Sequence, residues 1–171
     1  MIDLGERIGM SEVRELVAAC CGAERMAMRR TLWLAVGGED DRAAYNALRV
    51  LTHLPEEERG WLAEHRDALI DLAMTTSHVG KRRLVMTLLE RQPVEATDVR
   101  TDYLDFCLSR INSTEPYAIR ALGLKQAYAQ CRHYPELIAE LRQEIEIMSL
   151  GELSPGLFSA RRQILRKLRK S

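Results

Sequence analysis

The chain has 171 residues, a mass of 19.5 kDa and 46% hydrophobic residues, enough to bury a core without disulfides or metal. Its 25 Lys and Arg residues balance its 25 Asp and Glu residues, which disfavours both a uniformly basic nucleic-acid binder and a polyacidic tail. The content of 10 glycines and 5 prolines also excludes collagen and low-complexity disorder.

Targeting signals are not expected from this sequence. Asp3, Glu6 and Arg7 interrupt the first ten residues, so no apolar signal-peptide segment forms there. No stretch approaches the roughly 18 apolar residues that span a bilayer. The four cysteines lie at positions 20, 21, 107 and 131 without a C-x-x-C spacing, and we expect buried free thiols. We therefore expect a cytoplasmic protein without membrane contact.

Helices are expected throughout, because Ala, Leu, Glu, Arg and Met dominate and alternating β-branched runs are missing. Capping residues, prolines and glycines indicate where each helix begins and ends. The expected helices cover about residues 11–21, 24–36, 41–54, 56–74, 77–91, 98–112, 114–132, 135–148 and 154–170. The short connections predict that neighbouring helices are antiparallel.

Every second helix repeats the same pattern. The third, fifth, seventh and ninth helices align without gaps on Ala44, Arg82, Arg120 and Arg161, at spacings of 38, 38 and 41 residues. Small or apolar residues recur three, four and seven positions after each of these anchors, which predicts one buried helical stripe. Two-helix units of about 40 residues in tandem are typical of an α-solenoid. The alternative is a non-repetitive helical bundle with accidental periodicity.

With this period and helix pairing, residues 23–171 resemble the HEAT/armadillo repeat superfamily. The resemblance also rests on a basic residue early in the second helix of three units, at Arg82, Arg120 and Arg161. HEAT units typically carry an Asp six residues earlier, whereas this chain has Thr76, Thr114 and Pro155 there. In the first unit, Ala44 replaces the basic residue, as suits a terminal repeat.

The resemblance implies an all-α fold, a right-handed α-α superhelix of about four HEAT-like helical hairpins plus an N-terminal capping helix. We expect a single α-solenoid domain over residues 1–171. Its parts are the capping helix at 1–22 and repeats at about 23–54, 55–92, 93–133 and 134–171.

Two sets of basic residues are candidate sites. Arg82, Arg120 and Arg161 lie on or beside the apolar stripe, and we expect a structural ladder that bridges adjacent repeats, in which each arginine pairs with a carboxylate or carbonyl of a neighbouring helix; ligand binding is the alternative. The second set lies one, five and eight positions after the anchors, on a single helical face. Its basic members are Arg49, Arg83, Lys125, Arg162, Arg166 and Arg169, with Tyr45 and Tyr128 in the same column.

In a HEAT-like stack the second helices line the concave surface, so the resemblance implies a basic groove along this column. Residues 77–91, 114–132 and 154–170 carry net charges of +3, +2 and +6, whereas the preceding helices at 56–75, 98–112 and 135–148 carry −4, −1 and −3. Such a surface suits an acidic peptide or a phosphate backbone. The alternative is a solvated face of lysines and arginines.

Enzyme chemistry is not indicated by any motif. The histidines are scattered singly, so we expect no metal site, and there is no P-loop, no G-x-G-x-x-G and no nucleophile elbow; no cofactor is expected. Some HEAT-like solenoids are DNA glycosylases with a basic groove, aromatic residues and a catalytic carboxylate. Here Trp33 and Trp61 fall on first-layer helices, and the groove helices offer only Glu90 and Glu115.

The sequence therefore predicts a non-enzymatic binding or scaffold module that uses a basic concave groove for an acidic protein segment or a partner domain. The alternative function is binding of a nucleic-acid phosphate backbone through the same groove. A repair enzyme similar to a DNA glycosylase is the third and weakest reading.

Overall fold

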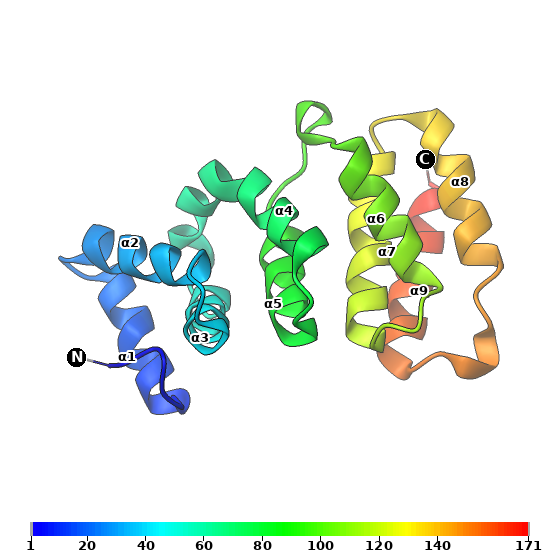
Figure 1. Ribbon diagram of the computed structural model, residues 1–171. Helices are drawn as coiled ribbons and strands as arrows, with labels where there is room; N and C mark the ends of the chain where they lie inside the picture. The colour runs from blue at the N-terminus through cyan, green and yellow to red at the C-terminus, as the bar shows by residue number, and fades with distance from the viewer. Residues whose placement is uncertain (1, 171) are drawn as a thin grey trace. The chain divides into compact units, whose positions relative to one another are not determined.

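The computed structural model describes residues 2–170, and every regular element in this range is helical (Figure 1). The α-helices are α1 (Met10–Cys21), α2 (Arg25–Val36), α3 (Asp41–Thr52), α4 (Arg66–Thr75), α5 (Val79–Glu90), α6 (Thr101–Ile111), α7 (Tyr117–Cys131), α8 (Pro135–Glu146) and α9 (Pro155–Leu168). Short 3₁₀ helices connect them at η1 (Glu56–Glu58), η2 (Gly60–His65), η3 (Ala96–Asp98) and η4 (Leu150–Glu152). The all-α fold of successive helices is confirmed.

Local capping explains several of the helix boundaries. The carboxylate of Asp40 accepts hydrogen bonds from the backbone N–H groups of Arg42 at 2.8 Å and Ala43 at 3.1 Å, which fixes the start of α3. The Ser154 hydroxyl oxygen accepts from the backbone N–H of Leu157 at 3.2 Å and caps α9 in the same way. These side chains satisfy backbone donors that have no partner within the helix.

One predicted helix is broken in the structure. Residues 56–74 form η1, η2 and α4 rather than one continuous α-helix. Gly60 lies at the break, and glycine is among the weakest helix formers because its unfolded backbone has the most freedom to lose. The Arg59 side chain donates from Nε to the carbonyl oxygen of Leu54 at 2.7 Å, which holds the turn against the end of the preceding segment.

The chain divides into two compact units, Met1–Leu88 and Leu89–Ser171. In the first unit α1, α2 and α3 pack against one another. In the second unit α7 is central, because it packs against α6, α8 and α9 (Figure 1). No helix in the described part of the chain combines the length and the apolar character needed to cross a membrane.

The repeated stripe forms the core of both units. Eleven of its twelve positions are buried and the twelfth, Leu165, is half-buried. The buried members are Ala47, Leu48, Leu51, Val85, Met86, Leu89, Gly123, Leu124, Ala127, Ile164 and Leu168. Because each helix buries the same positions, the periodicity of the sequence corresponds to a repeated packing arrangement.

Polar contacts of side chains also follow the repeat period. The Lys81 ammonium pairs with the Asp41 carboxylate at 2.7 Å, across 40 positions of sequence. In the second unit, Nε2 of His133 lies 2.7 Å from the carbonyl oxygen of Val94, 39 positions earlier. Contacts at this separation join equivalent parts of successive repeats, as in a solenoid.

Candidate functional site

The ladder arginines contact the ends of the helices that precede them. In each case Nε of the arginine donates to a backbone carbonyl oxygen near the end of that helix. The donor–acceptor pairs are Arg82–Ala73 at 3.1 Å, Arg120–Ile111 at 2.8 Å and Arg161–Ile145 at 3.5 Å. A guanidinium satisfies carbonyls that lack an intrahelical partner and complements the negative end of the helix dipole. Donor and acceptor belong to the two helices of one predicted repeat, so these contacts lie within repeats, whereas the sequence predicts contacts between adjacent repeats.

A further arginine makes the same contact and has no counterpart in the sequence-predicted ladder. Nε of Arg29 on α2 donates to the carbonyl oxygen of Cys20 at 3.1 Å, nine residues earlier, at the end of α1. The Arg29 guanidinium is buried and also pairs with the Glu58 carboxylate. The feature that identifies Arg29 is the separation of nine residues between the arginine and the carbonyl that it contacts. Arg82 and Arg120 have the same separation.

The predicted column residues in the first unit differ in their surroundings. Arg49 is half-buried and donates from Nη1 to the carbonyl oxygen of Ile8 at 3.1 Å, a contact that attaches the segment before α1 to α3. Arg83 is exposed on α5.

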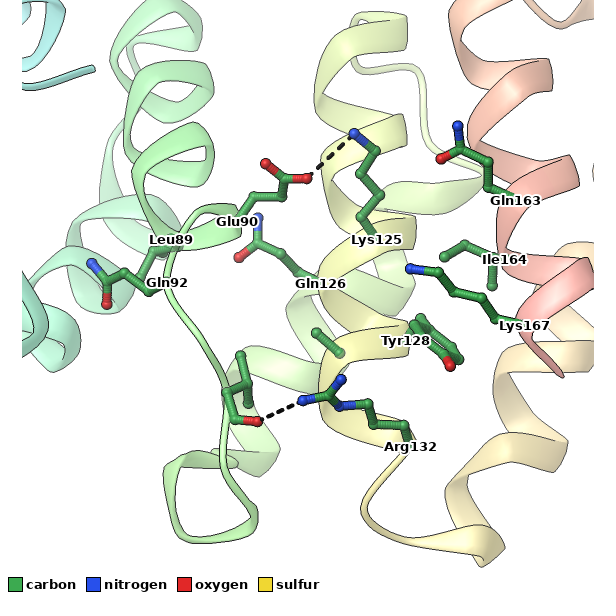
Figure 2. A pocket seen from close by; sticks show the side chains of 12 residues that line it. Leu89, Glu90, Gln92, Lys125, Gln126, Tyr128, Arg132, Gln163, Ile164 and Lys167 are labelled. Carbon is green, nitrogen blue, oxygen red and sulfur yellow. Dashed lines mark hydrogen bonds and ion pairs between the residues drawn. The ribbon is translucent and has the colours of Figure 1, made fainter. Parts of the chain in front are cut away.

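In the second unit, the predicted Lys125 and Tyr128 lie in a cleft of about 220 Å³ (Figure 2). The lining residues are Leu89, Glu90, Gln92, Val94, Lys125, Gln126, Tyr128, Ala129, Arg132, Gln163, Ile164 and Lys167. The end of α5, the connection to α6, one face of α7 and one face of α9 therefore border one cleft.

The cleft is lined by three cations and one carboxylate. The Lys125 ammonium lies 3.4 Å from Oε1 of Glu90, and about a third of each side chain is exposed. The Lys167 ammonium lies 5.3 Å from the centre of the Tyr128 ring, within the range of a cation–π contact. Arg132 donates from Nη2 to the carbonyl oxygen of Val94 at 3.2 Å (Figure 2). This hydrogen bond holds the guanidinium beside the connection between α5 and α6. The result is a positively charged surface next to an aromatic ring.

Two further clefts adjoin this one. A cleft of about 460 Å³ shares Lys125 and Gln163 with it, and a cleft of about 280 Å³ shares Gln163 and Lys167. We call the three together the α7–α9 groove. Arg166 lines the smaller of these two clefts, with Lys167 and Lys170, whereas Arg162 and Arg169 are exposed on α9 and line none of the three.

The groove residues of α9 follow a different alignment from its buried stripe, which keeps Arg161 as the anchor and buries Ile164 and Leu168. Alignment on Arg161 requires a spacing of 41 residues, whereas the 38-residue spacing of the earlier units leads from Arg120 to Phe158. Arg120 and Phe158 are each the fourth residue of their helices. Positions one, five and eight after Phe158 are Ser159, Gln163 and Arg166, and all three line the α7–α9 groove.

The first unit has a cleft of different character. It encloses about 510 Å³ between α1, α2 and the segment before α1, and its lining is mostly apolar. Glu15 and Glu24 are the charged residues among those that line it. Among the lining residues that the structure describes, an acidic ligand would meet no cation in this cleft.

Groups with potential catalytic or metal chemistry are held in structural roles. Burial raises the pKa of the Cys20 and Cys131 thiols to about 11, so both are protonated near neutral pH. The His65 ring is stacked on Trp33, with ring centres 4.1 Å apart, and meets the edge of Trp61 in the first unit. Within residues 2–170, no group of three His, Cys, Asp or Glu side chains is placed to hold a metal ion.

The helical hairpins, their common core stripe and their repeated arginine contacts define an α-helical repeat protein. A family model described as HEAT repeat domain matches residues 2–168, and the chain belongs to this family. HEAT repeats generally act as protein-binding scaffolds. No curated protein and no solved structure matches the chain.

Proposed function

We propose that the protein is a non-enzymatic binding module that holds an acidic protein segment in the α7–α9 groove. The observation that carries the proposal is the collection of Lys125, Arg132 and Lys167 around one cleft, with Glu90 as the only acid in its lining. Carboxylates of a bound segment would meet three cations from two helices and the following loop. Electrostatic complementarity of this kind directs a partner to one site and sets its register.

The charge distribution favours a protein segment over a nucleic-acid backbone. Binding of duplex DNA draws its affinity from many phosphate contacts along a long basic surface. The cations of the groove are confined to a short stretch of α7 and α9, and Arg162 and Arg169 lie outside the groove lining.

A binding role also agrees with the state of the acidic residues in this unit. Glu90 is paired with Lys125, and Glu115 is paired with Arg110 at 3.2 Å. A glycosylase of the HEAT-like type needs a carboxylate available to its substrate, and both candidates have cationic partners. We therefore assign the groove to binding rather than to catalysis.

The experiment is a fluorescence anisotropy titration with a labelled 12-residue peptide of Glu, Ser and Gly, at 50 and 150 mM NaCl. We expect saturable binding that weakens at the higher salt concentration, because the contacts are exposed charges. The double variant Lys125→Glu with Lys167→Glu should abolish binding. The matched control, Arg14→Glu with Arg30→Glu, makes the same change of charge on the first unit and should bind like the wild type.

An equal loss of binding in both double variants would contradict the proposal, because the net charge of the whole chain would then be the cause. A labelled 20-base-pair duplex is the second probe. If the duplex binds more tightly than the peptide and is released by Lys125→Glu with Lys167→Glu, the groove binds phosphate backbones and the acidic-segment proposal is wrong. Circular dichroism spectra of each variant establish that the helices are retained.

A further inference from the structure

The α7–α9 groove has a second end with a different chemical character. This end is the cleft of about 460 Å³ near the first turns of α7 and α9. Its lining residues are Tyr117, Ala118, Ala121, Lys125, Ser154, Gly156, Leu157, Ser159, Ala160 and Gln163. Apart from Lys125, which it shares with the basic cleft, none of these side chains is charged.

Small residues create the space in this cleft. Ala118, Ala121, Gly156, Ser159 and Ala160 present little more than backbone and Cβ atoms to it. A Cβ atom built on Gly156 would meet no other atom within 4 Å, so the space beside it is open. A row of small side chains between two helices leaves room for one large side chain of a ligand.

Apolar surface borders this cleft. Tyr117, one of the lining residues, is 48% exposed. The Arg120 guanidinium lies 5.6 Å from the centre of the Tyr117 ring, within the range of a cation–π contact. Exposed aromatic side chains next to an open cleft are suited to bury an apolar side chain of a partner.

The distance between the two ends follows from helix geometry. About nine residues separate the middle of the apolar cleft, near Ala121 and Ser159, from the far end of the basic cleft, at Arg132 and Lys167. At a rise of 1.5 Å per helical residue, the two lie roughly 13 Å apart. An extended peptide spans this distance with about four residues, at roughly 3.3 Å per residue.

We infer that the groove recognises a two-part motif in the bound segment. One part is a single large apolar or aromatic side chain, and the other is a group of acidic residues about four residues away, on either side of it in the sequence. This inference rests on the proposed function and specifies the partner further. The apolar side chain fills the cleft of small residues, and the acids meet Lys125, Arg132 and Lys167. Apolar burial supplies affinity that exposed charge pairs do not supply, because such pairs are worth little in water.

The test compares four labelled peptides of equal length by fluorescence anisotropy. The first carries three Glu residues in a Ser/Gly background, the second adds a Trp four residues from the acids, the third places the Trp next to the acids, and the fourth has the Trp without acids. We expect the second peptide to bind at least tenfold more tightly than the first, and the third to resemble the first.

A variant that fills the cleft separates this inference from the proposed function. Ser159 is an exposed position of α9 that lines the apolar cleft, so Ser159→Trp fills the cleft without disturbing the core. In this variant the second peptide should lose its tenfold advantage over the first, so the first two peptides should bind with equal affinity. Ala139→Trp, at an exposed position of α8, is the control and should retain the tenfold difference.

The outcomes are distinguishable. If the acidic peptide binds but the correctly spaced Trp improves binding less than twofold, the two-part motif is wrong and the proposed function stands. If Ser159→Trp weakens the first and second peptides equally, the apolar cleft is not a separate subsite and the inference is again overturned. If no peptide with acids binds at all, the proposed function fails and this inference fails with it.

Discussion

Nε of Arg29 donates to the carbonyl oxygen of Cys20 at 3.1 Å, and Arg82 and Arg120 make the same contact with the carbonyls nine residues before them. Each contact joins the start of one helix to the end of the helix before it. The same arginine contact therefore recurs between α1 and α2, between α4 and α5, and between α6 and α7. In α8 and α9 the corresponding contact spans 16 residues and is longer, at 3.5 Å.

Loss of one of these arginines should destabilise its hairpin. Arg120→Met keeps most of the apolar volume but leaves the carbonyl of Ile111 without its donor. We expect the free energy of unfolding to fall by about 1–2 kcal/mol, the usual cost of removing one partner from a hydrogen bond that involves a charged group. Urea denaturation followed by circular dichroism measures this change. Arg162→Met, at an exposed position of α9, should change stability by less than about 0.5 kcal/mol; a similar loss in both variants would contradict a capping role for Arg120.

Gly123 permits the close approach of α6 and α7. A Cβ atom on Gly123 would lie 2.9 Å from the carbonyl oxygen of Cys107 and 3.1 Å from Cβ of Arg110, so the two helices would have to separate. Gly123→Ala gains about 1 kcal/mol of helix propensity, but overpacking typically costs about 1–3 kcal/mol. We expect net destabilisation of about 1 kcal/mol by thermal or urea unfolding. Gly156→Ala, where the added Cβ meets nothing, should be neutral or stabilising; a stabilising Gly123→Ala would show that this packing is looser than described.

Alkaline pH should weaken the fold through the buried thiols. Burial raises the pKa of Cys20 and Cys131 from an ordinary value of 9.0 to about 11, so the folded protein retains protons that the unfolded chain releases. The stability that these thiols contribute is present in full below about pH 9 and is lost as the pH rises toward 11. The difference in unfolding free energy between wild type and Cys131→Ala should therefore shrink over this pH range.

The same thiols should resist alkylation. At pH 8 in native buffer, iodoacetamide should modify Cys20 and Cys131 about 100-fold more slowly than in 8 M urea, because burial lowers the thiolate fraction and blocks access. Cys21 is half-buried and adjacent to Cys20, and it should react before Cys20 does. Mass spectrometry of tryptic peptides assigns each site. Equal native rates at the three positions would contradict the burial described for them.

Glu90 should compete with an acidic ligand for Lys125. Glu90→Gln removes this competitor from the cleft while it keeps the size of the side chain. We expect an acidic peptide to bind about two- to fivefold more tightly, consistent with the ~0.5–1 kcal/mol typical of an exposed ion pair. Glu136→Gln makes the same change at an exposed position of α8 and should leave the affinity unaltered. A loss of affinity in Glu90→Gln would place the ligand elsewhere.

Much of the fold could be predicted from the sequence, because its signals are local. The residues of the buried stripe recur at fixed positions, and caps such as Asp40 and Ser154 act on the nearest backbone groups. The sequence does not predict the break at Gly60, because the acids before it favour a helix start and a single glycine is tolerated inside many helices. The sequence alignment of alternate helices begins with α3, so it does not include Arg29, which lies on α2.

The candidate site depends on helix rotation, which residue type alone does not define. On α7 the predicted column positions, Lys125 and Tyr128, line the groove. On α9 a three-residue offset of the anchor turns the helix by about 60°, since three residues cover roughly 300° at 3.6 residues per turn. Gln163, Lys167 and Arg166 therefore line the groove. Arg162 and Arg169 lie on other faces of α9.

The most direct test of the proposed binding groove is an NMR titration of the ¹⁵N-labelled protein with the 12-residue acidic peptide. The account predicts dose-dependent shifts of the backbone amides that border the groove, above all those of Lys125, Tyr128, Arg132, Gln163 and Lys167. Amides of α1 and α2, where the cleft is apolar and its charged lining residues are acidic, should not move. Shifts centred on the first unit, or none at a tenfold excess of peptide at 50 mM NaCl, would contradict the assignment of the α7–α9 groove as the binding site.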